Sequence, residues 1–216
     1  SLMADMLHIW DHTMPTMAGL PIQLVETSPQ LRTIQKQRIK AASIAWHDDV
    51  RSLPKAALFG VANEFFDALP IDQAVWRKRA WRHRLITVVH GALGFIEGPA
   101  LSASELARWQ ITNDKEDITE GSIAEYCPAA EPIMQQLAGR IARHGGACLI
   151  IDYGKNDNFS DSLQAVSTHK PVDLFYQPGN ADISHWVDFA ALRRAAIKTG
   201  ARFLGPVTQA DFLMAI

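Results

Sequence analysis

The stretch AALFGVANEFFDALP, residues 56–70, decides how this sequence folds. It opens with an uninterrupted apolar run, residues 56–62, typical of a strand that is buried on both faces of a parallel sheet. A second run of this kind covers residues 147–151, in a strand pattern that extends to Asp152. We therefore predict a strand at each run and expect both strands to lie inside a parallel sheet.

Helical patterns alternate with these runs and with two further strand patterns, at residues 22–26 and 43–46. Ser28 and Pro29 form a typical N-cap and first-turn pair. Helices are predicted over residues 2–10, 29–40, 128–143 and 188–198. Because strands alternate with helices, the sequence predicts a doubly wound α/β fold with a mostly parallel sheet.

One region departs from this alternation. Residues 73–89 alternate polar and apolar positions around Lys78 and Arg79, which predicts a hairpin. Residues 91–126 contain scattered Gly, Ser, Asn and Asp with weak periodicity, which is typical of a loop. We interpret residues 73–127 as an inserted segment of hairpin and loop within a single domain over residues 1–216.

Composition indicates a globular protein. Its 216 residues are 48% hydrophobic and 20% charged with a net charge of -2, so we expect neither disorder nor bulk attraction to nucleic acid. No apolar run reaches the roughly 18 residues that span a bilayer, so no membrane anchor is expected. Cys127 and Cys148 lie in unrelated contexts, which is typical of a reducing compartment: the cytoplasm, or the mitochondrial matrix in a eukaryote.

Two weaker signals concern metals and nucleic acid. Only His8 and His12 have ligand spacing on a helix face, and no Cys or carboxylate cluster joins them, so we expect no metal. A basic patch at the hairpin is compatible with RNA contact, with a solvated hairpin, or with docking on an acidic protein substrate. Its residues are Arg77, Lys78, Arg79, Arg82, His83 and Arg84, interleaved with Trp76 and Trp81.

Polar residues follow each predicted strand, where ligands bind in open α/β sheets. These residues are Glu26, Asp48, Asn63 and Asp152. A carboxylate such as Glu26 can accept both hydroxyl hydrogens of a ribose. Alternatively, Glu26 lies in a solvated turn before a helix, whose dipole favours a negative charge. The position of Glu26 leaves both interpretations open.

The motif NEFFDALP, residues 63–70, also allows two interpretations. Glu64 and Asp67 offer acceptors for a cationic group, with Phe65 and Phe66 as flat walls. Alternatively, Asn63 caps a short helical turn, the two aromatic rings belong to the core and Asp67 is a surface residue.

Five segments, in order, resemble the MidA-like family of S-adenosylmethionine-dependent methyltransferases. They are LVETSP at 24–29, NEFFDALP at 63–70, LIIDYG at 149–154, VDF at 187–189 and GPVTQ at 205–209. The octapeptide NEFFDALP is the most specific of them. The resemblance implies a class I methyltransferase-like fold and S-adenosylmethionine as cofactor. For mitochondrial members it also implies methylation of an arginine of a respiratory complex I subunit, so that the partner is a protein substrate.

The resemblance further implies residue roles on the cofactor side. Glu26, with Thr27 and Ser28 in the same turn, would hold the ribose of the cofactor. Asp48 would contact the adenine, and Asn63 would border the methyl group.

On the acceptor side, the resemblance makes Asn63, Glu64 and Asp67 the candidate catalytic residues. Glu64 and Asp67 would receive a guanidinium, whose planar fork needs a carboxylate for two-point contact. We expect at least one of Phe65 and Phe66 to pack in the core.

One departure concerns the start of the family pattern. The glycine-rich turn of the family, Glu-x-Gly-x-Gly-x-Gly in outline, and the strand before it are not in this sequence. Glycines in that turn let the backbone approach the methionine part of the cofactor. We expect the chain to be a fragment of an enzyme. The alternative is a catalytically inactive assembly or binding protein that keeps the fold, and a homo-oligomer is compatible with either.

Overall fold

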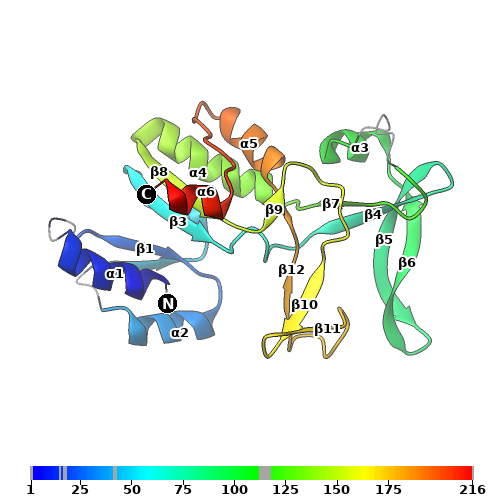
Figure 1. Ribbon diagram of the computed structural model, residues 1–216, viewed down its shortest axis with the longest axis horizontal. Helices are drawn as coiled ribbons and strands as arrows, with labels where there is room; N and C mark the ends of the chain where they lie inside the picture. Colours follow the sequence, from blue (N-terminus) through cyan, green and yellow to red (C-terminus); the bar gives the residue numbers. More distant parts are fainter. Residues whose placement is uncertain (1, 15, 17–18, 41–42, 112–117, 216) are drawn as a thin grey trace. The chain divides into compact units, whose positions relative to one another are not determined.

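The computed structural model describes residues 2–14, 16, 19–40, 43–111 and 118–215 (Figure 1). The chain divides into two compact units, Ser1–Ala56 and Ala57–Ile216. The interpretation of residues 1–216 as a single domain stays a prediction.

The first unit alternates helices and strands as predicted. Its elements are α1 (Leu2–Thr13), β1 (Ile22–Val25), α2 (Pro29–Arg38), β2 (Ile44–His47) and the 3-10 turn η2 (Val50–Ser52). Strands β1 and β2 are parallel, with Ile22 opposite Ile44. The Ser28 hydroxyl accepts a hydrogen bond from the Leu31 N–H at 3.3 Å, so Ser28 is the N-cap of α2 as the sequence predicts.

The second unit is built around two parallel strands that are far apart in sequence. These are β3 (Leu58–Asn63) and β8 (Gly146–Ile151), paired from Leu58 opposite Gly146 to Asn63 opposite Ile151. A Cβ at Gly146 would lie 1.9 Å from the Leu58 carbonyl oxygen, so the start of this pairing requires glycine. Both strands are confirmed, and they lie where the apolar runs predict them.

The expected burial of β3 on both faces is wrong for this chain. Side chains along β3 alternate between half-buried and exposed, and Phe59 is 82% exposed. The helix α4 (Ala130–His144) packs against β3 and β8, and it leads directly into β8. Because alternate side chains of a strand point to opposite faces, only one set meets this helix.

The remaining elements of the α/β part follow β8. A second parallel pair joins β9 (Gly154–Lys155) to β13 (Val187–Asp188), and α5 (Phe189–Ile197) packs on α4 (Figure 1). The chain continues to the short helix α6 (Gln209–Met214). Both predicted helices, over residues 128–143 and 188–198, are confirmed.

The predicted hairpin of residues 73–89 is also confirmed. Strands β4 (Asp72–Arg77) and β5 (Ala80–Val89) are antiparallel, with Trp76 opposite Trp81. Lys78 and Arg79 form the turn with positive φ angles of 52° and 60°. A two-residue turn with positive φ at both positions matches the right-handed twist of the flanking strands, so it is favoured in tight hairpins.

The loop predicted for residues 91–126 is wrong. This region contains β6 (Ala92–Ala100), α3 (Ala103–Trp109) and β7 (Ile123–Tyr126), while residues 112–117 lie outside the described residues. The sheet order is β6-β5-β4-β7. Gly94, Gly98 and Pro99 give β6 the composition of a loop, although β6 pairs with β5 over most of its length.

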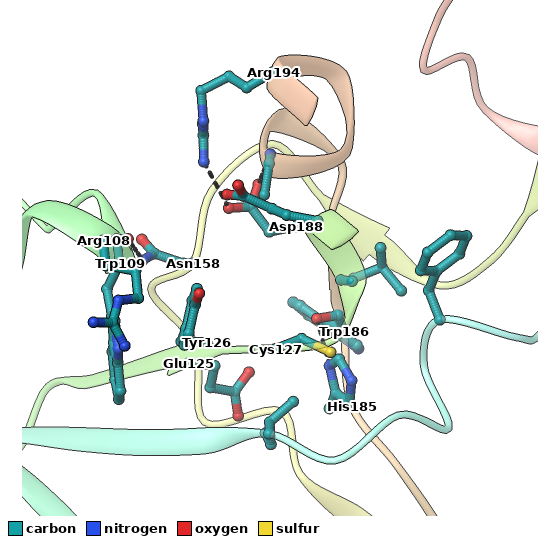
Figure 2. A pocket seen from close by; sticks show the side chains of 16 residues that line it. Arg108, Trp109, Glu125, Tyr126, Cys127, Asn158, His185, Trp186, Asp188 and Arg194 are labelled. Atoms are coloured by element: carbon teal, nitrogen blue, oxygen red, sulfur yellow. Dashed lines mark hydrogen bonds and ion pairs between the residues drawn. The ribbon is translucent and has the colours of Figure 1, made fainter. Parts of the chain in front are cut away.

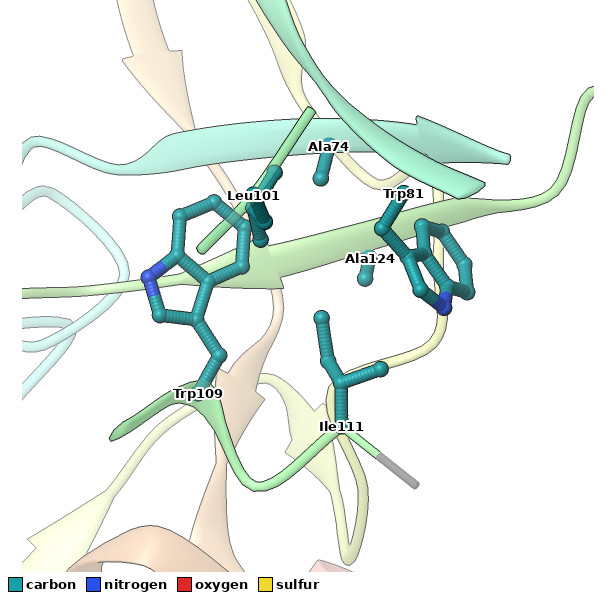
Figure 3. Packing of buried hydrophobic residues seen from close by; sticks show 6 residues of the cluster. All are labelled: Ala74, Trp81, Leu101, Trp109, Ile111 and Ala124. Atoms are coloured by element: carbon teal, nitrogen blue, oxygen red, sulfur yellow. The ribbon is translucent and has the colours of Figure 1, made fainter. Parts of the chain in front are cut away.

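The antiparallel sheet has its own hydrophobic core, which Figure 3 shows. Trp81 and Trp109 are 2% and 4% exposed, and they pack with smaller residues of the sheet and of the segments that precede and follow α3. The smaller members are Ala74, Leu101, Ile111 and Ala124. The inserted segment is therefore a packed layer.

Three short antiparallel strands complete the second unit. They are β10 (Gln164–Ser167), β11 (Lys170–Val172) and β12 (Asp182–Ser184), in the order β11-β10-β12, and the sequence patterns do not predict them. Among the residues that the structure describes, no helix has the length and hydropathy required to span a membrane.

The basic patch at the hairpin is largely paired with carboxylates. Arg82 lies 3.1 Å from Glu97, Arg84 lies 2.7 Å from Asp161 and Arg77 lies 3.5 Å from Glu120. Trp81, which an RNA-stacking role would need at the surface, is buried in the core.

Candidate functional site

The carboxylate of Glu26, the residue after β1, accepts hydrogen bonds from the turn that follows it and from α2. Glu26 follows β1, and its Oε1 accepts a hydrogen bond from the Ser28 N–H at 2.9 Å. Its Oε2 accepts a hydrogen bond from the Gln35 side-chain amide at 3.1 Å. A carboxylate offers about four acceptor sites, so each oxygen can still accept a ribose hydroxyl hydrogen. Glu26 therefore fits the ribose-binding role that the sequence suggests.

A single arginine links the ends of β1 and β2. Arg32 donates from Nε to the Glu26 carbonyl oxygen and from Nη2 to Asp48 Oδ1, each at 2.6 Å. Two of the predicted cofactor residues, Glu26 and Asp48, are thus brought together within the first unit. Thr27 is exposed, and Ser28 is the helix cap described above.

The NEFFDALP motif of the second unit wraps around the carboxylate of Asp152. Its Oδ2 accepts hydrogen bonds from the backbone N–H groups of Phe65, Phe66 and Asp67, at 3.2, 2.9 and 3.4 Å. Glu64 enters the turn with a φ of 46°, and its N–H donates to the Ile151 carbonyl. Asp152 therefore holds the motif in shape, a role that the sequence analysis missed.

The side chains of the motif divide between core and surface. Phe66 is completely buried, which confirms the expectation that at least one of the two aromatic residues packs in the core. Phe65 is half-buried and meets Phe66 edge-on. Asn63 and Glu64 are exposed, whereas Asp67 is only 8% exposed. The interpretation of Asp67 as a surface residue is therefore wrong.

Carboxylates gather at the carboxyl ends of β3 and β8. Burial raises the pKa of Asp67, and the nearby carboxylates of Asp152 and Glu64 raise it further, while His185 opposes them. Burial also raises the pKa of Asp152, against the lowering effect of its backbone hydrogen bonds. Such a group of acidic side chains attracts a cation. Within the described parts of the chain, no group of three or more His, Cys, Asp or Glu residues is arranged to hold a metal ion.

A small pocket of about 30 Å³ lies near the motif in the second unit, with room for only a few waters (Figure 2). Figure 2 shows Glu125, Tyr126, His185 and Asp188 around it, and Phe66 forms part of its wall. The Glu125 carboxylate accepts from Gln73 at 2.8 Å, and Asp188 caps α5 through the Ala191 N–H at 3.0 Å. These two acids therefore support the fold. In the sequence, the VDF segment at residues 187–189, one of the five that resemble the family, points to this pocket, because Val187 and Asp188 line it.

Comparison with known proteins identifies the family. Residues 1–207 match the family model described as "Putative S-adenosyl-L-methionine-dependent methyltransferase". The mitochondrial protein arginine methyltransferase NDUFAF7 of Xenopus tropicalis is 34% identical, with 90% of this chain and 49% of that protein covered. The human protein of the same name is 35% identical, over 79% of this chain and 37% of that protein.

A solved structure supports the same family. A superfamily member from Burkholderia thailandensis, crystallised with bound S-adenosyl-homocysteine, superposes with a TM-score of 0.79 at 26% identity. The match covers 98% of this chain and 56% of that chain. The chain thus spans about half the length of these relatives. It belongs to the family of S-adenosylmethionine-dependent methyltransferases, and the predicted family and α/β fold class are confirmed.

Proposed function

We propose that the protein that carries this chain is an S-adenosylmethionine-dependent methyltransferase that modifies an arginine side chain of a protein. The family and the names of the relatives support this proposal. The observation that carries it is the group of carboxylates formed by Glu64, Asp67 and Asp152 at the ends of β3 and β8. An arginine side chain has the charge and the planar donor fork that such a group recognises.

On the cofactor side, Glu26 accepts the two ribose hydroxyl hydrogens, and Asp48 contacts the adenine. Thr27 and Ser28 belong to the same turn as Glu26. The hydrogen bonds from Ser28 and Gln35 to the Glu26 carboxylate, and the one from Arg32 to the Asp48 carboxylate, support this assignment. They fix both carboxylates before the ligand arrives. Bound S-adenosylmethionine supplies an electrophilic methyl group on a sulfonium.

On the acceptor side, Glu64 and Asp67 orient the guanidinium, and Asn63 borders the methyl group. A cation beside Asp67 offsets the repulsion from Asp152 and Glu64 that raises its pKa in the free protein. The attacking nitrogen must lose a proton, and the Asp67 carboxylate beside it can accept that proton during or after the attack. Positioning of the nitrogen accounts for most of the catalysis in this scheme.

The protein substrate in this proposal is a subunit of respiratory complex I, methylated during assembly. The site of action is then the mitochondrial matrix in a eukaryote, or the cytoplasm in a bacterium. The relatives named as mitochondrial support the first location.

Two measurements on the full-length protein test the proposal. Calorimetry should detect binding of S-adenosylhomocysteine, and mass spectrometry should detect methylated arginine in the substrate protein. Asp67→Asn should keep cofactor binding and reduce methyl transfer, because Asn cannot accept the proton or neutralise the guanidinium. Full transfer by Asp67→Asn would remove Asp67 from the mechanism. Absence of ligand binding by the wild-type protein would favour the inactive binding protein instead.

A further inference from the structure

A chain of two side-chain hydrogen bonds connects β2 to the carboxylate of Glu26. Trp46, on β2, donates its indole N–H to Gln35 Oε1 at 2.9 Å. Gln35, on α2, donates from Nε2 to Glu26 Oε2 at 3.1 Å. All three side chains are half-buried, so solvent competes with these hydrogen bonds less than at an exposed site.

The chemistry of the indole fixes the direction of this chain. An indole N–H can only donate, so it selects the carbonyl oxygen of the Gln35 amide. The NH₂ group of that amide must then face Glu26. The opposite orientation would set two donors against each other at Trp46 and two acceptors against each other at Glu26. Trp46 therefore ensures that Gln35 offers Glu26 a donor.

The two ends of the Glu26 carboxylate are held independently. Gln35 holds Oε2, while the Ser28 N–H holds Oε1 at 2.9 Å. A glutamate side chain otherwise loses rotamer entropy when a ligand immobilises it. A carboxylate that is already held binds the same ligand more tightly.

We propose that Gln35, oriented by Trp46, is a positioning residue for recognition of the cofactor ribose. It acts through Glu26, whose remaining acceptor sites it directs to the two ribose hydroxyls. This inference rests on the proposed function, in which Glu26 binds the ribose.

The test compares two ligands on the full-length protein by calorimetry: S-adenosylhomocysteine and its 2′,3′-dideoxy analogue, which lacks both ribose hydroxyls. Gln35→Met should weaken binding of S-adenosylhomocysteine about ten-fold and leave binding of the analogue unchanged. Trp46→Phe, which keeps an aromatic ring, should cause a smaller loss with the same selectivity. Gln37→Met is the matched control, since Gln37 is exposed and lies about 200° further around α2. It should change neither affinity.

Several results would overturn the inference. An equal loss for both ligands would indicate a general structural effect, and no loss with S-adenosylhomocysteine would show that Gln35 has no role. In a Glu26→Ala background, Gln35→Met should cause no further loss, and additive losses would contradict action through Glu26. If Gln35→Met does not fold, the ligand selectivity of Trp46→Phe decides. Failure of the wild-type protein to bind S-adenosylhomocysteine is a separate outcome, because it refutes the proposed function itself.

Discussion

Replacing Asp152 tests whether one carboxylate holds the NEFFDALP turn. In Asp152→Ala, the N–H groups of Phe65, Phe66 and Asp67 lose their acceptor. A hydrogen bond to a charged group contributes about 1.5–3 kcal/mol. Of the bonds that Asp152 accepts, those from the N–H groups of Phe66, at 2.9 Å, and Tyr153, at 3.0 Å, have the best distances, and the exposed Tyr153 N–H can donate to water when Asp152 is removed. The bonds at 3.2 and 3.4 Å contribute less. Removing a half-buried charge recovers part of the loss, so we expect the free energy of unfolding to fall by about 2 kcal/mol.

Urea unfolding of the full-length protein, followed by circular dichroism, measures this difference. Asp152→Asn keeps one carbonyl oxygen as an acceptor and should lose about half as much stability. Asp182→Ala is the control, because Asp182 is exposed on β12, and it should change stability by less than about 0.5 kcal/mol. A loss in Asp152→Ala no larger than that of the control would refute the conclusion that Asp152 shapes the turn.

Two further predictions concern the same motif. The raised pKa of Asp67 means that the folded state binds a proton more tightly than the unfolded chain, so stability falls as the pH rises from the ordinary value of 3.8 through the raised one. Asp67→Asn should therefore unfold at a higher urea concentration than wild type at pH 7. This difference in stability should disappear below pH 3.8, where Asp67 is protonated in both the folded and the unfolded state. Equal urea midpoints of unfolding at pH 7 would contradict the burial of a charged Asp67. Phe66→Ala should lower the free energy of unfolding by about 3–5 kcal/mol, because Phe66 is completely buried. Phe65→Ala should lower it clearly less, because Phe65 is half-buried. Similar thermal unfolding shifts for the two alanine variants would show that the rings share one environment.

The strands that carry the candidate site could be predicted from sequence because their signals are local. The apolar runs of β3 and β8 and the Ser28-Pro29 cap of α2 need no knowledge of distant residues. The same holds for the polar residues after each strand, since the carboxyl end of a strand is fixed once the strand is recognised. Glu26 and Asp48 became candidate cofactor residues in this way.

The features that escaped prediction depend on distant partners. In β6, a Cβ at Gly98 would lie 2.8 Å from Leu85 Cδ1, so glycine allows close packing there although its composition indicates a loop. The ion pairs of the basic patch could not be predicted because Glu97 and Asp161, the partners of Arg82 and Arg84, are not their neighbours in sequence. The role of Asp152 also depends on residues that are distant in sequence. An acidic residue after a strand can bind a ligand or hold a loop, and only the three backbone donors around it identify the second role.

The acceptor that shapes the NEFFDALP turn comes 85 to 87 positions later in the chain than the residues it holds. During synthesis, the octapeptide therefore leaves the ribosome long before it can take its final form, and it must wait for β8 to emerge and dock beside β3. A nascent or prematurely terminated chain that stops before this point carries the NEFFDALP motif without the acceptor that shapes its turn. The turn that carries the proposed acceptor residues Glu64 and Asp67 can therefore take its final form only late in synthesis, after Asp152 has emerged.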